Sequence, residues 1–168
     1  VREEKGLKKQ EDFETAIDLE LNAYIPPSYI PNEYQKLDIY KRIAGIESEE
    51  EYEDMLEELM DRFGEPPKAV QILLSIASLK ALAHRVYIKE IKQNGKEVKI
   101  SIFERAKINP AGFPPILEKY KNNLKMKLEE TPYFLVSLKG RRPKETLDVL
   151  ELLGSILKDF QSVAEETE

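Results

Sequence analysis

The chain has 168 residues, of which 41% are hydrophobic and 35% charged, and its net charge is −6. This length is enough for one domain with a real hydrophobic core, and the acidic balance argues against nucleic acid as the main partner and against direct DNA binding. The absence of cysteine excludes disulfides and thiolate metal sites and weakly favours the cytoplasm. No apolar run approaches the roughly 20 residues of a membrane span, so no membrane partner is expected.

The two ends of the chain are predicted to lie outside its folded part. Residues 1–14 are charged and nearly lack apolar side chains, which predicts a flexible linker, and the final segment 162–168 is predicted to fray. A single α+β domain is therefore expected over residues 15–161. At its start, apolar and polar residues alternate from Ile17 to Ile25, which predicts a half-buried strand.

A proline-rich connection and a helix are predicted next. Prolines within residues 26–31 predict a stiff, extended segment, because proline fixes its own φ and disfavours the helical region for the residue before it. Asn32 is expected to cap a helix over residues 33–44. The spacing of its apolar residues predicts that one face packs inward, made of Tyr34, Leu37, Tyr40, Ile43 and Ala44.

The most strongly marked helix lies between Ser48 and Pro67. Ser48 followed three residues later by Glu51 is a capping-box pattern, in which each side chain can accept the other's backbone N–H. Gly64 followed by two prolines is expected to end the helix. The apolar residues of the segment have the spacing of one inward face: Tyr52, Met55, Leu56, Leu59 and Phe63.

Carboxylates collect on the opposite face of this predicted helix, at Glu50, Asp54, Glu57, Glu58 and Asp61. Acids four residues apart repel by roughly 0.2–0.5 kcal/mol per pair, and the later ones lie near the negative end of the helix dipole. Arg62 is the only basic residue of the helix. Two interpretations stay open. The face is either solvated, at a cost of about 1 kcal/mol, or it is a docking surface for a basic patch, with Arg62 holding the carboxylates in place.

The remaining segments predict a buried helix followed by strands. Residues 67–84 are apolar nearly all round, which is typical of a central, buried helix. Asn94-Gly95 predicts a type I′ hairpin over residues 87–103, with a bulge in its first strand. A short helix from about Pro114, a second strand pair and a last helix from Pro143 follow. The predicted fold class is α+β, with a helical first half packed with two strand pairs and a C-terminal helix.

The sequence offers little for catalysis or for metal or cofactor binding. His84 is the only histidine and is interpreted as a structural residue. The seven glycines form no phosphate-binding motif, and the acids of residues 49–54 lack the spacing of a calcium loop. We therefore expect no catalytic site, no metal and no cofactor, and expect that the chain alone is not an enzyme.

Basic residues gather at two places in the second half of the chain. One is the turn Lys139–Lys144, which is best interpreted as solvated because no aromatic residue is interleaved with it. The other is the hairpin, with Lys89, Lys92, Lys96 and Lys99. Because such clusters can contact phosphates, a small nucleic-acid-binding module is the alternative function. A free-standing oligomerisation domain is a third hypothesis.

Three motifs in a fixed order then point to a family. An extended segment leads to Y-I-P, a helix carries L-x-x-Y-K-R-I from Leu37 to Ile43, and D-R-F-G-x-x-P runs from Asp61 to Pro67. Together they resemble the C-terminal domain of the bacterial transcription-repair coupling factor (Mfd). The resemblance extends over residues 15–160, although the second half of the chain is less diagnostic.

The resemblance implies a non-catalytic regulatory domain in transcription-coupled nucleotide excision repair. In that family the full-length protein is an ATP-driven DNA translocase that removes stalled RNA polymerase and recruits UvrA. Its C-terminal domain folds back on a UvrB-like module of the same protein and masks the UvrA-binding surface, which is autoinhibition. The interface positions correspond here to Glu58, Asp61 and Arg62, with Glu57 and Asp54 beside them. This hypothesis expects the acidic ridge to be left unneutralised by its own fold.

Overall fold

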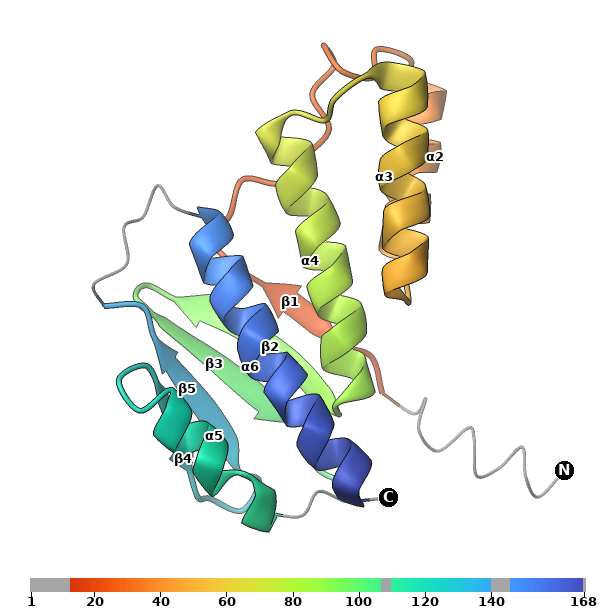
Figure 1. Ribbon diagram of the computed structural model, residues 1–168. Coiled ribbons are helices and arrows are strands. Elements are labelled where there is room, and N and C mark those ends of the chain that lie inside the picture. Colours follow the sequence, from red (N-terminus) through yellow and green to blue (C-terminus); the bar gives the residue numbers. More distant parts are fainter. Residues whose placement is uncertain (1–12, 107–109, 140–145, 168) are drawn as a thin grey trace, which may run out of the picture. The chain divides into compact units, whose positions relative to one another are not determined.

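The computed structural model describes residues 13–106, 110–139 and 146–167, and its contacts divide the chain into two compact units (Figure 1). Unit 1 is formed by the described residues within 1–19, 83–139 and 159–168. Unit 2 is formed by those within 20–82 and 140–158. The predicted α+β class is confirmed, since the helices are accompanied by a five-stranded sheet. Most of the predicted linker over residues 1–14 lies outside the described residues.

Unit 1 is built on this mixed sheet. Its strand order is β1-β2-β3-β5-β4; β1 runs parallel to β2, and the other neighbours are antiparallel. The strands are β1 (Ala16–Asp18), β2 (Ile88–Asn94), β3 (Glu97–Ile102), β4 (Leu124–Lys127) and β5 (Tyr133–Ser137). The two predicted strand pairs are thus joined edge to edge by the pairing of β3 with β5.

The hairpin and its bulge lie where the sequence predicts them. The turn itself differs from the predicted one: Asn94 is paired with Glu97, so the central residues are Gly95 and Lys96. Among these and Asn94, only Gly95 has a positive φ, of +68°, so the turn lacks the two positive φ values of type I′ and instead has Gly at the first central position, as type II′ does. The register of β2 against β3 shifts between Ile88 and Glu90, which is the predicted bulge. Local sequence therefore determines this part of the sheet.

The strand predicted from Ile17 to Ile25 is too long, because only Ala16–Asp18 forms a ladder. In the parallel register, Asp18 lies beside Lys92, and β2 ends two residues later at Asn94. The residues after Asp18 therefore have almost no partner strand left to pair with, although their alternation has the period of a strand.

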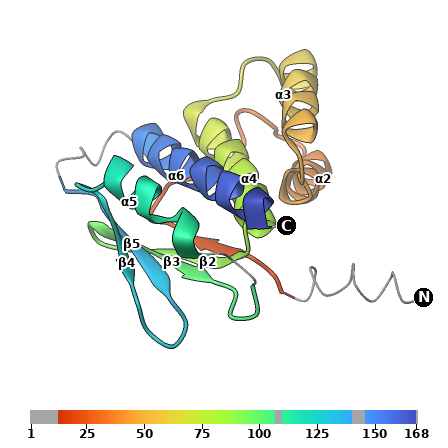
Figure 2. The ribbon, with the colours of Figure 1, turned by 60° about the horizontal axis from the view of Figure 1, so that its bottom comes forward.

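Helical segments of unit 1 cover one face of the sheet (Figure 2). The rings of Phe113 and Phe160 lie 5.1 and 4.7 Å from that of Phe134 on β5, and 5.3 Å from each other. The Tyr120 hydroxyl donates to Asp159 Oδ2 at 2.7 Å. The helical elements are a 3-10 turn, η1 (Pro110–Gly112), then α5 (Pro114–Lys119), and the last turns of α6 (Thr146–Thr167), which extends into the segment predicted to fray.

Unit 2 is helical, and its core lies among α2 (Glu33–Ala44), α3 (Glu49–Phe63) and the greater part of α4 (Lys68–Arg85). In Figure 1, α2 and α3 lie side by side. The fully buried side chains of this core include Ile30, Ile39, Leu59, Val70 and Leu74. On α3, Met55 and Leu59 are buried, and Tyr52, Leu56 and Phe63 pack against the same cluster, which confirms the predicted inward face.

The helix ends also follow the sequence. Asn32 Oδ1 accepts the N–H of Gln35, and Ser48 Oγ accepts the N–H of Glu51 at 3.1 Å. The Glu51 carboxylate accepts the N–H of Glu47 rather than that of Ser48, so the reciprocal bond falls one residue earlier than expected. Gly64 adopts a φ of +89° immediately after α3, where a residue without a Cβ avoids strain.

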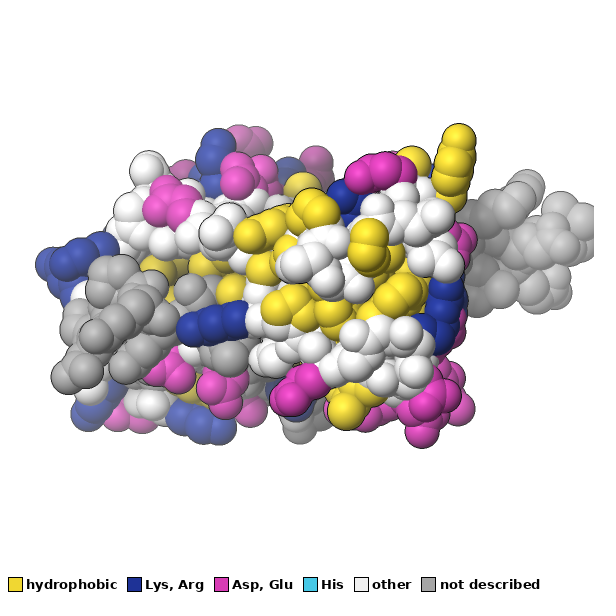
Figure 3. All heavy atoms as spheres, turned by 90° about the horizontal axis from the view of Figure 1, so that it is seen from above, with side chains coloured by type: hydrophobic (Ala, Val, Ile, Leu, Met, Phe, Trp, Pro, Cys, Tyr) yellow, Lys and Arg dark blue, Asp and Glu magenta, His cyan; other side chains and the backbone are white. Residues whose placement is uncertain are grey.

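The predicted inward face of α2 is partly wrong. Tyr34 is 85% and Leu37 56% exposed, and Ala44 is also exposed. Ile43 is buried as predicted, and Ile39, which was not assigned to this face, is buried as well. The Tyr40 hydroxyl accepts the backbone N–H of Ile25 at 2.8 Å, a bond that fits the observed rotation of the helix. Because α2 carries two apolar stripes, periodicity alone could not decide between them. Figure 3 shows the molecule from above the view of Figure 1, and hydrophobic side chains gather on the surface seen from there.

Two glycines allow a matched test of the packing. A Cβ at Gly112 would lie 2.8 Å from Cγ1 of Val163, a stiff β-branched side chain within unit 1, whereas a Cβ at Gly154 would meet nothing within 4 Å. We predict that Gly112→Ala lowers the free energy of unfolding by about 1–3 kcal/mol. Gly154→Ala should raise it by roughly 0.5–1 kcal/mol, because glycine is costly inside a helix. Urea unfolding measures both, and equal effects would contradict the packing described here.

Candidate functional site

The outer side of α3 presents the candidate site. Because Met55 and Leu59 turn inward, the helical period places Asp54, Glu57 and Asp61 outward, and all three are exposed. Glu58 lies nearer to α2, and its side chain is 32% exposed. The carboxylates predicted from the sequence are therefore on the surface but divide into two groups with different surroundings.

Glu58 is held by two arginines from two helices. Arg42 of α2 donates from Nη1 to Glu58 Oε2 at 2.7 Å and from Nη2 to Oε1. Arg62, one turn further along α3, donates to Oε2 at 2.8 Å. Arg42 also lies 4.0 Å from Asp38 on its own helix. A bidentate guanidinium fixes orientation as well as distance, so the trio Arg42, Glu58 and Arg62, here called the arginine clamp, joins α2 to α3.

The clamp perturbs the acid–base properties of its members. Hydrogen bonds from Arg42, and then from Arg62, lower the pKa of Glu58 from its ordinary 4.5 to about 2. The hydrogen bond to Glu58 in turn raises the pKa of Arg42. Because the side chains remain about one third exposed, solvent screens the attraction, and the clamp contributes on the order of 1 kcal/mol to stability.

The expectation that the whole acidic ridge is unneutralised is wrong for Glu58. Its charge is already matched by Arg42 and Arg62, and Arg62 pairs with Glu58 but with no other carboxylate of the described residues. Within the described residues, Asp54, Glu57 and Asp61 form no ion pair. Sequence reasoning missed Arg42 because it lies 16 residues before Glu58 on another helix.

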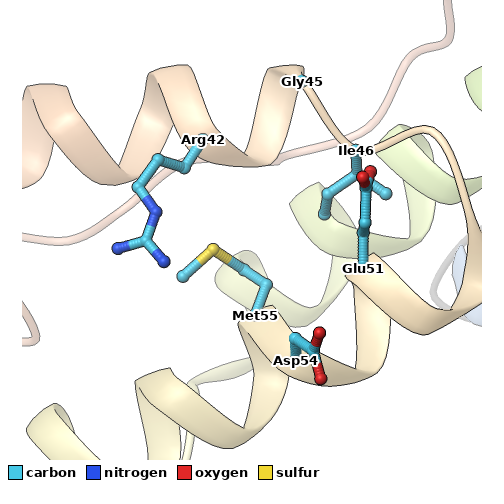
Figure 4. A pocket seen from close by; sticks show the side chains of 6 residues that line it. All are labelled: Arg42, Gly45, Ile46, Glu51, Asp54 and Met55. Carbon is cyan, nitrogen blue, oxygen red and sulfur yellow. The ribbon is translucent and has the colours of Figure 1, made fainter.

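A shallow crevice adjoins the clamp in unit 2 (Figure 4). Its volume is about 380 Å³, and it is lined by the end of α2 and the start of α3, through Arg42, Gly45, Ile46, Glu51, Asp54 and Met55. Figure 4 shows the Arg42 guanidinium on the α2 side, the Asp54 and Glu51 carboxylates on the α3 side, and Met55 between them. An apolar floor beside carboxylates suits an aliphatic chain that ends in a cation.

The other residues singled out by the sequence lie elsewhere. His84 Nε2 is 3.1 Å from the backbone oxygen of Phe13, and its ring stacks on the Phe13 ring at 4.5 Å, which agrees with a structural histidine. Lys89 pairs with Glu104 at 2.9 Å. In the turn Lys139–Lys144, all residues after Lys139 lie outside the described residues. Among the described residues, no group of three or more His, Cys, Asp or Glu could hold a metal ion.

Comparisons with known proteins place these elements in a family. A model of the TRCF domain matches residues 19–113, which is more than half of the chain. The chain belongs to the TRCF domain family. The matched region contains α2, α3 and α4, and therefore the whole arginine clamp and the exposed acids.

Relatives of this TRCF domain are much longer proteins. The transcription-repair-coupling factor of Bacillus subtilis is 35% identical over 171 residues, which cover 99% of this chain but 14% of that protein. The factor of Staphylococcus haemolyticus is 37% identical over 63% of this chain, which corresponds to 9% of its own length. The chain thus spans only a small part of the curated relatives that it matches.

A solved structure agrees in fold. A crystal structure of the C-terminal domain of transcription-repair coupling factor has a TM-score of 0.79 and 25% identity, and the match covers 92% of this chain and 97% of that one. The resemblance inferred from the motifs is therefore confirmed. Within the part of the chain that the structure describes, no helix is long and apolar enough to cross a membrane.

The clamp predicts a pH effect on this TRCF domain. Because the pKa of Glu58 is lowered in the folded state, the clamp stabilises the fold fully above pH 4.5 and loses this contribution as the pH falls toward 2. Glu58→Gln should therefore lower the free energy of unfolding by about 1 kcal/mol at pH 7, with a smaller difference at pH 3.

Urea unfolding at the two pH values measures this difference. Glu57→Gln is the matched control, since Glu57 forms no ion pair with a described residue, and it should change stability at pH 7 by less than about 0.5 kcal/mol. An equal loss in both variants at pH 7 would show that the clamp does not stabilise the domain.

Proposed function

We propose that this TRCF domain is a non-catalytic regulatory domain of a cytoplasmic transcription-repair coupling factor. In this proposal it folds back on the UvrB-like module of the same protein and masks the surface to which UvrA binds. UvrA and RNA polymerase are then indirect partners, through the full-length protein. The observation that carries the proposal is the row of exposed carboxylates on α3, Asp54, Glu57 and Asp61, which no cation of the described chain neutralises.

Charge complementarity supports a cationic partner surface. The arginine clamp carries a net charge of +1, from two guanidinium groups and one carboxylate, whereas the three neighbouring acids carry −3. The acids are costly where they are, because they repel one another and lie along a helix whose C-terminal end is already negative. A basic surface on the UvrB-like module would offset that cost.

The clamp has a positioning role in this proposal. Since Glu58 is engaged by Arg42 and Arg62, we assign direct partner contacts mainly to Asp61, Glu57 and Asp54. The crevice beside Asp54 would receive the aliphatic stem of a lysine or arginine, whose charged end would reach the Asp54 or Glu51 carboxylate. Tyr34 and Leu37 of α2 are exposed apolar side chains of the same unit and offer further contact area.

The contact does not need to be strong. A tethered domain experiences an effective concentration of about millimolar, so a weak contact is enough to keep the surface masked. An ion pair at the rim of an interface contributes roughly 0.2–1 kcal/mol. Such a balance allows binding of a second protein to displace the domain.

We predict that Asp61→Lys in the full-length parent raises the apparent affinity for UvrA by about fivefold, which corresponds to about 1 kcal/mol lost from the mask. Asp61 is exposed and outside the clamp, so the variant should remain folded. Glu58→Lys is a poorer choice, because it would place a lysine between Arg42 and Arg62.

The control is Glu130→Lys, which makes the same charge change at an exposed residue of unit 1. Binding of UvrA to the immobilised full-length proteins measures the effect. If Asp61→Lys and the control bound UvrA as weakly as the unchanged protein, the masking role of α3 would be refuted.

A further inference from the structure

The face of the sheet opposite the helical segments of unit 1 carries an unexpected group of lysines. On the covered face, Ile100, Phe134 and Val136 are fully buried. The intervening residues point the other way, because side chains alternate along a strand. Four of them are exposed lysines on three strands: Lys92 of β2, Lys99 of β3, and Lys125 and Lys127 of β4.

The strand order brings these lysines together. Lys92 lies directly opposite Lys99, Lys99 is paired with Leu135 of β5, and Leu135 is paired with Lys125. Neighbouring strands lie about 4.8 Å apart, so three lysines from three separate segments form one row of roughly 14 Å. Lys127 lies on the same face, about 6.8 Å along β4 from Lys125. The sequence hypothesis had grouped Lys92 and Lys99 with the other hairpin lysines and the turn Lys139–Lys144, and had not included Lys125 or Lys127.

This arrangement is unfavourable unless an anion is added. Like charges directly opposite each other in a sheet are destabilising, and none of the four lysines forms an ion pair with a described residue. The acids on or beside this face are Asp18, Glu90 and Glu97, near the β1 side and the hairpin end of the sheet, and Glu129, whose carboxylate accepts a hydrogen bond from the Tyr133 hydroxyl at 3.3 Å. Three of the lysines, Lys99, Lys125 and Lys127, therefore lie on the β3-β5-β4 side of the face, whereas Lys92 lies beside Asp18.

Between the lysines lies an aromatic and apolar centre. Tyr133 and Leu135 of β5 are half-buried on this open face, and Lys99 Nζ lies 4.3 Å from the centroid of the Tyr133 ring. Proteins that bind single-stranded nucleic acid combine positive charges along the backbone with flat side chains on which bases stack. An acidic peptide would use the lysines but would have no need of such a platform.

From this juxtaposition we propose that the open face of the sheet, through Lys92, Lys99, Lys125 and Lys127 around Tyr133, binds single-stranded nucleic acid. The chain's overall charge of −6 argued against such binding, but the acids of α3 belong to unit 2 and the lysines to unit 1. The site is independent of the proposed masking surface.

The test is fluorescence anisotropy of a labelled oligothymidylate with the complete chain. We expect a dissociation constant in the micromolar range at low salt and, for four phosphate contacts, a log–log salt slope of about −3. Lys99→Glu combined with Lys125→Glu should weaken binding about tenfold or more and reduce the slope by about 1.4. The matched control, Lys68→Glu with Lys80→Glu, makes the same charge change on α4 and should stay within about twofold of the unchanged chain.

Several outcomes would overturn the proposal. These are no binding at low salt, an equal loss in the control, polyglutamate binding as tightly as the oligonucleotide, or a duplex of equal length binding more tightly than the single strand. Circular dichroism checks that the variants fold. If the Glu variant does not fold, Lys99→Gln with Lys125→Gln replaces it and should weaken binding about fivefold; a loss smaller than twofold would also refute the site.

Discussion

The bidentate contact between Arg42 and Glu58 ties α2 to α3, and the arrangement of the candidate site depends on this contact. The two helices are joined by the short turn of residues 45–48, which alone leaves their relative rotation open. The buried Ile39, Ile43 and Leu59 hold them together without direction, whereas a planar guanidinium facing a carboxylate defines an orientation. Arg62 completes the arrangement from within α3. The exposed acids of α3 therefore project from a surface whose geometry is set before any partner arrives.

The acids of α3 divide into one that is paired within the fold and three that have no ion-pair partner among the described residues. Glu58 stabilises the fold, since its charge is matched by two arginines and its pKa lies well below the ordinary value. Asp54, Glu57 and Asp61 receive no such compensation from the described chain, so they raise the energy of the free domain slightly. The chain belongs to the TRCF domain family, and its match covers only 14% of the Bacillus subtilis relative, so the compensating positive charge is proposed to lie outside this domain.

Local signals in the sequence predicted much of the fold. Asn32, Ser48 and Gly64 each act within four residues, and the helix ends follow from them. Asn94-Gly95 located the hairpin, but the turn is centred one residue later, on Gly95 and Lys96. Two predictions failed because they depended on distant partners. The first strand is short because β2 ends soon after Lys92, and α2 is rotated so that its second apolar stripe faces outward. The length of the strand and the rotation of α2 both depend on tertiary contacts, which cannot be read from the periodicity of the sequence.

The candidate site was predicted in position but only partly in role. Helical spacing showed that the carboxylates of α3 share a face, yet it could not reveal that an arginine of another helix neutralises one of them. The direct test of the account is a titration of this chain against the isolated UvrB-like module, followed by calorimetry at low and physiological salt. We expect saturable binding that weakens with salt and that excess UvrA displaces. Absence of binding at low salt by the folded chain, or binding that UvrA leaves unchanged, would contradict it.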